Sequence, residues 1–299
     1  MGTVERLTAL LPEDAAALLV ERGDAANQVR LRVGRPVQID VGQGGGAMSG
    51  TPMSREDMNR ILAALMEYSV YARQEELDRG FFTLDDGSRV GVCGGMTGEG
   101  DRLRLDGIGS ACVRVARPVK GCADGLLGHI APPGGSLRST LLFSPPGLGK
   151  TTMLRDIARQ LSDGGVCVGI ADERHELAAC YRGVPTLDVG LRTDVVDGGP
   201  RDRAIARLIR GMSPRVVVAD EIGDADDARA LADAVRCGAA VVASAHAAGL
   251  EDALARPMLR AMLEAGVVDC AALLGPGPGE VRAVWHRTEG EGVSAWKRA

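Results

Sequence analysis

The stretch Phe143–Thr152, FSPPGLGKTT, nearly matches the phosphate-binding loop pattern G-x-x-x-x-G-K-[ST]. Ser144 stands where that pattern has its first glycine, and Pro145 and Pro146 follow it. The loop comes after the apolar run 139–143 and before an amphipathic segment typical of a helix. Loop amides and a helix N-terminus would then point at one anion. The sequence therefore predicts a strand, a phosphate-binding loop and a helix, in that order.

The donors for phosphate are expected from the later half of the loop, Gly147 to Thr152, where every residue keeps its backbone N–H. The residues expected to contact the nucleotide are Pro146, Gly147, Leu148, Gly149, Lys150, Thr151 and Thr152. Lys150 would neutralise the β- and γ-phosphates, and the Thr151 hydroxyl would bind Mg²⁺. The alternative is a glycine turn without a ligand. Because Ser144 replaces the first glycine of the pattern, the sequence leaves open whether the loop forms the tight bend that glycine would allow.

Downstream of residue 138, strand-like runs alternate with helical segments, which indicates a parallel sheet. The expected strands are 139–143, 166–170, 186–190, 215–220 and 239–244. Apolar runs such as VVVA (216–219) favour strands that are buried on both faces. We therefore expect an α/β domain whose parallel sheet carries helices on both faces.

A second motif, RVVVADEIG (215–223), ends an apolar strand in Asp220 and Glu221. Ligand sites in parallel sheets lie at the carboxyl ends of the strands, so this pair is expected to face the loop. Asp220 would hold Mg²⁺, and Glu221 would orient and activate the attacking water. The alternative is a helix N-cap, a position that acids also favour.

Other expected strands also end in polar residues. These residues are Asp172, Glu173, Arg174, Ser244 and His246. His246 is a candidate γ-phosphate sensor, and a packed histidine is an equally weighted alternative. Arg192, in the expected polar loop 187–200, is a candidate anion contact, with a solvated charge as its alternative.

The three arginines Arg203, Arg207 and Arg210 recur at spacings of four and three, which places them on one helix face. Such a face is usually only solvated. In an oligomer it could instead meet an acidic segment of a neighbouring subunit, such as 224–227.

The first part of the chain reads as a smaller α+β domain over residues 1–128. It contains an expected helix after Pro12, strands within 29–41, a loop at 42–50, a helix capped by Ser54, a helix ending at Gly80, a hairpin over 81–95 and a strand at 110–119. The Pro- and Gly-rich segment 129–138 is the expected linker, and 139–299 is the expected second domain.

The composition of the chain excludes several classes of protein. The net charge of −5 over 299 residues gives no electrostatic case for nucleic acid. Seven scattered cysteines without a CxxC pair argue against disulfides or a zinc site and favour a reducing cytoplasm. We find neither a signal peptide nor an apolar run of the ~18 residues that a membrane span needs. The protein could still dock on a membrane complex.

The order of these segments resembles the stage III sporulation protein AA family, which is related to the hexameric secretion ATPases of type II and type IV systems. The segments that carry the resemblance are the phosphate loop, DERHE (172–176), GLRTDVVDG (190–198), RGMSPRVVVADEIG (210–223) and ASAHA (243–247). In the first domain, RLRVGRPVQI (30–39), EELDRGFFTLDDGSRVGV (75–92) and VRVAR (113–117) extend it. Nearly the whole chain is covered.

The resemblance implies a RecA/AAA-like ATPase core with Walker A and Walker B motifs, preceded by the small α+β domain. Residues 172–174 match the acidic box of the secretion ATPases, and His246 matches their histidine box. Relatives form rings in which arginines of the N-terminal domain reach the nucleotide, a role that would fall to Arg114 or Arg117. Ser144 departs from the family, where glycine is more usual.

The resemblance further implies a function: Mg²⁺-dependent ATP hydrolysis that powers or helps assemble a channel between mother cell and forespore. A homo-oligomer, a hexameric ring, would work in the cytoplasm and reach the membrane through membrane-embedded channel proteins. The alternatives are an ATPase of another secretion or pilus system and a nucleotide-gated ring scaffold with little turnover. A DNA motor or helicase is disfavoured by the acidic balance and the lack of a basic, aromatic stripe.

Overall fold

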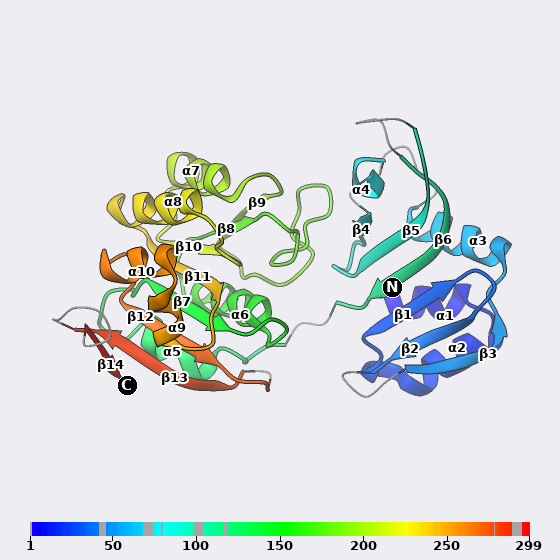
Figure 1. The fold of residues 1–299 in the computed structure, drawn as a ribbon, viewed down its shortest axis with the longest axis horizontal. Coiled ribbons are helices and arrows are strands. Elements are labelled where there is room, and N and C mark those ends of the chain that lie inside the picture. The colour runs from blue at the N-terminus through cyan, green and yellow to red at the C-terminus, as the bar shows by residue number, and fades with distance from the viewer. Residues whose placement is uncertain are drawn as a thin grey trace. The chain divides into compact units, whose positions relative to one another are not determined.

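The computed structural model describes residues 2–41, 46–67, 74–78, 80–98, 104–116, 119–277, 279–288 and 295–299 (Figure 1). The chain forms two compact units, one of residues 1–117 and 179–186 and the other of residues 118–178 and 187–299. The division lies upstream of the boundary at 128 that we expected. Much of the expected linker 129–138 follows a helix of the second unit, α5 (Asp124–Ile130).

The N-terminal unit is built on a six-stranded sheet in the order β3-β2-β1-β6-β5-β4, and every neighbouring pair is antiparallel. Its strands are β1 (Gln28–Arg32), β2 (Pro36–Asp40), β3 (Gly46–Pro52), β4 (Phe81–Thr83), β5 (Arg89–Thr97) and β6 (Arg104–Arg114). Its helices are α1 (Thr3–Leu10), α2 (Glu13–Arg22), the 3₁₀ turn η1 (Gly23–Ala25), α3 (Arg55–Leu65) and α4 (Gln74–Asp78).

Local sequence explains much of this unit. The Ser54 hydroxyl accepts the Asp57 N–H and so caps α3 as predicted, and the helix buries an apolar stripe of Met58, Ile61, Leu62 and Leu65. The hairpin predicted over 81–95 is formed by β4 and β5. The expected loop 42–50 is partly wrong, because its described end belongs to β3, which pairs with β2. Residues 42–45 lie outside the described residues.

The second unit is built on an eight-stranded sheet in the order β14-β13-β12-β7-β11-β10-β8-β9. Its strands are β7 (Thr140–Ser144), β8 (Val168–Asp172), β9 (Thr193–Asp197), β10 (Val216–Ala219), β11 (Ala240–His246), β12 (Cys270–Leu274), β13 (Val281–Arg287) and β14 (Trp296–Arg298). The pairs from β12 to β9 are parallel, and β13 and β14 add antiparallel strands at the other edge.

Helices cover both faces of this sheet, as the sequence predicted. They are α6 (Lys150–Asp163), α7 (Arg201–Met212), α8 (Ala225–Arg236), α9 (Leu250–Ala255) and α10 (Pro257–Glu264), together with α5. Leu141, Val217 and Val241 share one core with α7 and α8. The alternate strand residues Leu142 and Val218 are equally buried, because α6 packs on the opposite face (Figure 1).

One predicted strand was placed wrongly. The segment 186–190 is irregular, and the strand lies at β9, inside the segment that we expected to be a polar loop. β9 is half-buried, and among the described strands it pairs only with β8. An edge strand tolerates polar residues such as Asp194 and Asp197, which is why it reads as a loop. In the described part of the chain, no helix has the length and apolar character needed to cross a membrane.

Candidate functional site

In the loop between β7 and α6, the residues with left-handed backbone conformations are glycines. Gly147 and Gly149 have φ angles of +80° and +79°, a region that residues with a Cβ avoid. Ser144 does not adopt a positive φ, and its buried hydroxyl donates to the Pro145 carbonyl over 2.8 Å. The serine therefore fits its place without backbone strain, and the tight bend of the loop does not need a glycine there.

The strand order brings distant parts of the chain to this loop. β11 lies between β7 and β10, with Ser144 opposite His246 and Ala219 opposite Ala243. Because all three strands are parallel, their carboxyl ends meet at one edge of the sheet. The predicted residues after β7, β10 and β11 are therefore neighbours.

Lys150, the first residue of α6, points its ammonium group back across the loop. The side chain is buried, and Nζ lies 3.4 Å and 3.5 Å from the carbonyl oxygens of Ser144 and Pro145. His246 Nδ1 lies 3.0 Å from Nζ. Burial lowers the pKa of Lys150, and the nearby Asp220 carboxylate opposes that shift. A bound anion would restore the environment that an ammonium ion prefers.

Asp220 and Thr151 are in direct contact. The Thr151 hydroxyl donates to one Asp220 oxygen, and the Ser244 hydroxyl donates to the other. A hydroxyl and a carboxylate are hard oxygen donors of the kind that Mg²⁺ takes from proteins, which usually supply few ligands and leave the rest to phosphates and water. The pair therefore fits the predicted metal role.

Glu221 is held in an unusual backbone conformation. Its φ of +49° lies in the left-handed region, which costs a non-glycine residue on the order of 1–3 kcal/mol and is typical of functional sites. Its N–H donates to the Ser244 hydroxyl over 2.9 Å. The carboxylate contacts the Arg174 guanidinium, and His246 Nε2 lies 3.3 Å away. Ser244 thus orients both acids, a role that the strand-end pattern did not reveal.

The acidic segment 172–176 contributes mainly by organising the turn that follows β8. Asp172 is buried and accepts the N–H groups of Glu176 and Ala178, each over 2.9 Å. Burial raises the pKa of Asp172, and these backbone N–H groups oppose the shift. Arg155 of α6 donates to the carbonyl oxygens of Glu176 and Leu177 over 2.6 Å and 2.7 Å. Only Arg174 of this segment reaches the Glu221 carboxylate.

Arg201, which the sequence did not single out, links three elements. Its guanidinium lies 2.6 Å from Glu173 and contacts Asp227 at the start of α8. Asp227 also accepts the Gly223 N–H over 3.1 Å. Arg201 thereby connects the turn after β8 to the segment that follows Glu221. A pair of oppositely charged residues on two separate helices leaves no local signal in a sequence.

Of the predicted arginine contacts, Arg192 is not part of this cluster. Arg192 lies against the C-terminal end of α6, where its N–H donates to Ser162 Oγ over 2.6 Å and its guanidinium lies 3.3 Å from the Ser162 carbonyl. That is the end of α6 opposite to Lys150. Arg114 ends β6 in the N-terminal unit, and Arg117 lies outside the described residues.

The fold and the site together define the class, an α/β protein with the architecture of pilus and secretion ATPases. The crystal structure of the pilus retraction motor PilT with bound ADP aligns with a TM-score of 0.59 at 15% identity, covering 96% of this chain and 82% of that one. The Legionella pneumophila ATPase DotB aligns with a TM-score of 0.56 at 17% identity, covering 83% and 72%. These likenesses confirm the predicted fold class.

Sequence comparison gives the family. A family model described as "Sporulation stage III, protein AA" matches residues 10–293, and the chain belongs to this family. Stage III sporulation protein AA of Bacillus subtilis (strain 168) is 37% identical over 268 residues, which cover 87% of this chain and 86% of that protein. A shorter match, protein SEEDLING PLASTID DEVELOPMENT 1 of Arabidopsis thaliana, is 30% identical and covers 54% and 23%. The predicted resemblance is confirmed.

Proposed function

We propose that the protein is a Mg²⁺-dependent ATPase. The observation that supports this most is the meeting of Lys150, the Thr151–Asp220 pair and Glu221 at one sheet edge, beside a loop with two left-handed glycines. These are the groups that phosphoryl transfer to water needs: amide donors, one cation, two metal ligands and one base.

Each group has a task that follows from its place. The amides of the later loop and of the first turn of α6 bind the phosphate oxygens, and Lys150 balances their charge. Thr151 and Asp220 would hold Mg²⁺, which would supply positive charge to the reacting phosphate. Glu221 accepts the proton of the attacking water. Ser244 accepts the Glu221 N–H and donates to the Asp220 carboxylate, and so fixes the two residues relative to each other.

The Arg174–Glu221 ion pair sets a condition on this chemistry. A carboxylate that is paired with a guanidinium is a weaker base, because the positive charge stabilises its ionised form. Glu221 must leave Arg174 before it can take a proton from water. The Arg174 side chain is 59% exposed, so it is free to swing away and bind the γ-phosphate itself.

We infer the biological role from the family. ATP hydrolysis would power or help assemble a channel between mother cell and forespore, from the cytoplasmic side and through membrane-embedded channel proteins. The working form would be a hexameric ring, in which an arginine supplied in trans or by the N-terminal domain, such as Arg114 or Arg117, completes the site. Mass measurement with a non-hydrolysable ATP analogue tests the ring, and a monomer in all conditions contradicts it.

Steady-state phosphate release tests the catalytic proposal. We expect Glu221→Gln to bind ATP but to release phosphate at least about 100-fold more slowly, in the range of a lost general base. Lys150→Met should lose binding as well. Arg229→Met is the matched control, because Arg229 lies on α8 in an exposed ion pair with Asp226 and has no part in the proposed site. Equal rates for wild type and Glu221→Gln rule out Glu221 as the base.

A nucleotide-gated scaffold is a second candidate, and the double pairing of Glu221 with Arg174 and His246 favours it. In this case ATP would change the assembly without turnover. Arg174→Ala separates the two functions. A catalytic site responds with a changed rate of phosphate release, whereas a scaffold assembles with ATP and releases no phosphate in either form.

A further inference from the structure

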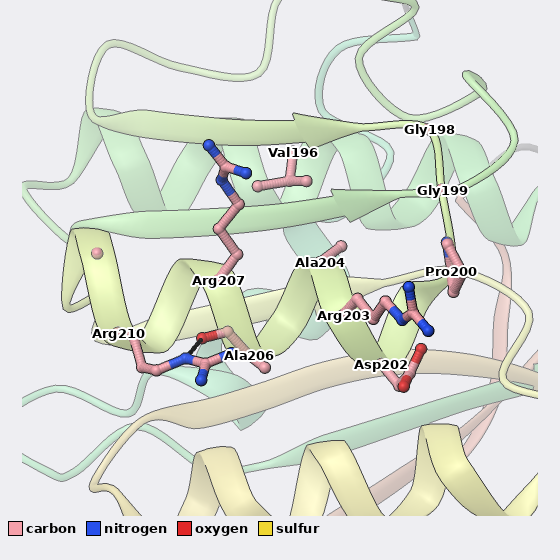
Figure 2. A pocket seen from close by; sticks show the side chains of 11 residues that line it. Val196, Gly198, Gly199, Pro200, Asp202, Arg203, Ala204, Ala206, Arg207 and Arg210 are labelled. Atoms are coloured by element: carbon pink, nitrogen blue, oxygen red, sulfur yellow. Dashed lines mark hydrogen bonds between the residues drawn. The ribbon is translucent and has the colours of Figure 1, made fainter.

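A groove on the second unit carries a surface that the proposed ATPase activity does not use. It lies between β9 and α7 and encloses about 750 Å³ (Figure 2). Its charged lining residues are Asp202, Arg203, Arg207 and Arg210, so the groove is basic although the whole chain carries a net charge of −5. The groove therefore attracts negatively charged groups.

Two of these arginines are available for a partner. Figure 2 shows Arg207 extending from α7 toward Val196 of β9, whereas Arg210 turns back and donates to the Ala206 carbonyl over 3.1 Å. Arg203 and Arg207 are exposed. Within the described ranges of the chain, neither side chain forms an ion pair or a hydrogen bond.

The strand that lines the groove at Val196, β9, also forms an open edge of the described sheet. Val168 donates its N–H to the Arg192 carbonyl and Gly198 donates its N–H to the Asp172 carbonyl, which fixes the register of β8 and β9. In a parallel pair, alternate residues of one strand make all the hydrogen bonds to the other. The residues between them, Thr193, Val195 and Asp197, therefore direct their backbone N–H and C=O groups outward, where the described sheet has no further strand.

The spacing of the two arginines along α7 matches the spacing of alternate residues along a β-strand. Arg203 and Arg207 are four residues apart on a helix, a rise of about 6 Å. Alternate residues of a strand are about 6.7 Å apart and lie on one face. A strand added at the edge of β9 would therefore carry side chains of the same face at nearly the spacing of the two arginines.

We propose that the groove between β9 and α7 binds an extended acidic segment of a partner protein. The segment adds a strand to the open edge of β9, and two carboxylates, two residues apart, pair with Arg203 and Arg207. Strand addition supplies main-chain hydrogen bonds, and the arginines supply the selectivity for acidic side chains. This site does not depend on ATP hydrolysis.

Two observations favour such a segment over other occupants. A polyphosphate or nucleic acid would meet outward carbonyl groups along β9, which repel an anion, whereas a polypeptide strand satisfies both N–H and C=O groups. A second copy of this chain offers few acidic residues on its strand edges. The other sheet edges, β3, β4 and β14, carry no acidic residue, and β9 itself places only Asp194 on the face that Val196 shares.

The test measures binding of a fluorescein-labelled peptide in which valine alternates with two glutamates, by fluorescence anisotropy on the full chain. The matched peptide has lysine in place of glutamate. We expect saturable binding of the glutamate peptide only, weakened about tenfold or more by Arg203→Glu with Arg207→Glu, since two ion pairs become two repulsions. The control is Arg256→Glu with Arg260→Glu, exposed residues of equal charge change, and it should bind like wild type.

A backbone variant tests the strand addition itself. Val195→Pro removes one outward N–H and leaves every β8–β9 hydrogen bond in place, because Val195 is one of the outward residues. We expect about fivefold weaker binding, the effect of one lost hydrogen bond, with an unchanged circular dichroism spectrum.

Several results overturn the proposal. They are no binding of the glutamate peptide, equal binding of the lysine peptide, and wild-type affinity of the arginine double variant. A single-stranded oligonucleotide that binds more tightly, and whose binding Val195→Pro leaves unchanged, would identify a polyanion site instead. A dimer in sedimentation that the arginine double variant abolishes would identify a second copy as the occupant.

Discussion

Replacing Arg201 by methionine should destabilise the second unit by about 3–5 kcal/mol. The side chains of Arg201 and Asp227 are each only 6% exposed, so removal of the guanidinium leaves a buried carboxylate with a single remaining described hydrogen-bond donor, the Gly223 N–H. Breaking a buried ion pair in this way costs far more than the pair itself contributes, because the remaining charge has lost its solvation.

The assay is urea unfolding followed by tryptophan fluorescence. Trp285 and Trp296 are the two tryptophans of the chain, and both belong to the second unit, so the signal reports that unit alone. The control is Arg229→Met, whose ion pair with Asp226 is 68% exposed on both sides and should contribute less than about 1 kcal/mol.

A double variant separates the buried charge from lost packing. Adding Asp227→Asn to Arg201→Met removes the uncompensated charge and should recover part of the lost free energy of unfolding. A loss below about 1 kcal/mol for Arg201→Met alone, equal to that of the exposed control, would refute the reasoning, because the two pairs would then be energetically alike.

Three further predictions concern single residues. Ser144→Gly should change ATP affinity less than about fivefold, since no positive φ is needed there, and a larger gain by calorimetry would show that serine strains the loop. Lys150→Met should weaken ATP binding at least about tenfold, as one charge-assisted contact is lost, and unchanged affinity would remove Lys150 from the site. Burial lowers the pKa of His286, with the charge of Arg138 and the neighbouring His129 adding to the shift. Near pH 6.5, His286 therefore binds a proton more readily in the unfolded chain than in the folded chain. Acidification below that pH should lower the urea midpoint of the second unit. His286→Gln should flatten this slope, and equal slopes would contradict the assignment.

Sequence reasoning succeeded where the chemistry is local. The phosphate-binding loop, and the strand that ends in Asp220 and Glu221, were predicted because each motif is continuous in the chain and sits between recognisable elements. The parallel order of the strands then required their ends to meet, and the structure brings Lys150, Asp220, Glu221 and His246 together. The chemical roles of these residues stay predictions.

Sequence reasoning failed where the information is not local. The half-polar strand β9 was read as a loop, because an edge strand needs no continuous apolar run. Arg201 and Asp227 lie 26 residues apart, and nothing in their surroundings indicates that they pair. The segment 179–186 belongs to the N-terminal unit although it lies within the sequence of the second. Contacts of this kind follow from packing alone.

The central claim, that Glu221 is the base of an ATPase site built by Lys150, Thr151 and Asp220, is tested most directly by a single turnover of pre-bound ATP. The rate of cleavage of the γ-phosphate would be measured in wild type and in Glu221→Gln, after calorimetry has shown equal nucleotide binding. We expect cleavage in the wild type and a rate at least about 100-fold lower in the variant. Equal cleavage rates in the two proteins would contradict the assignment of Glu221, and no cleavage in either, even in an assembled ring, would contradict the ATPase itself.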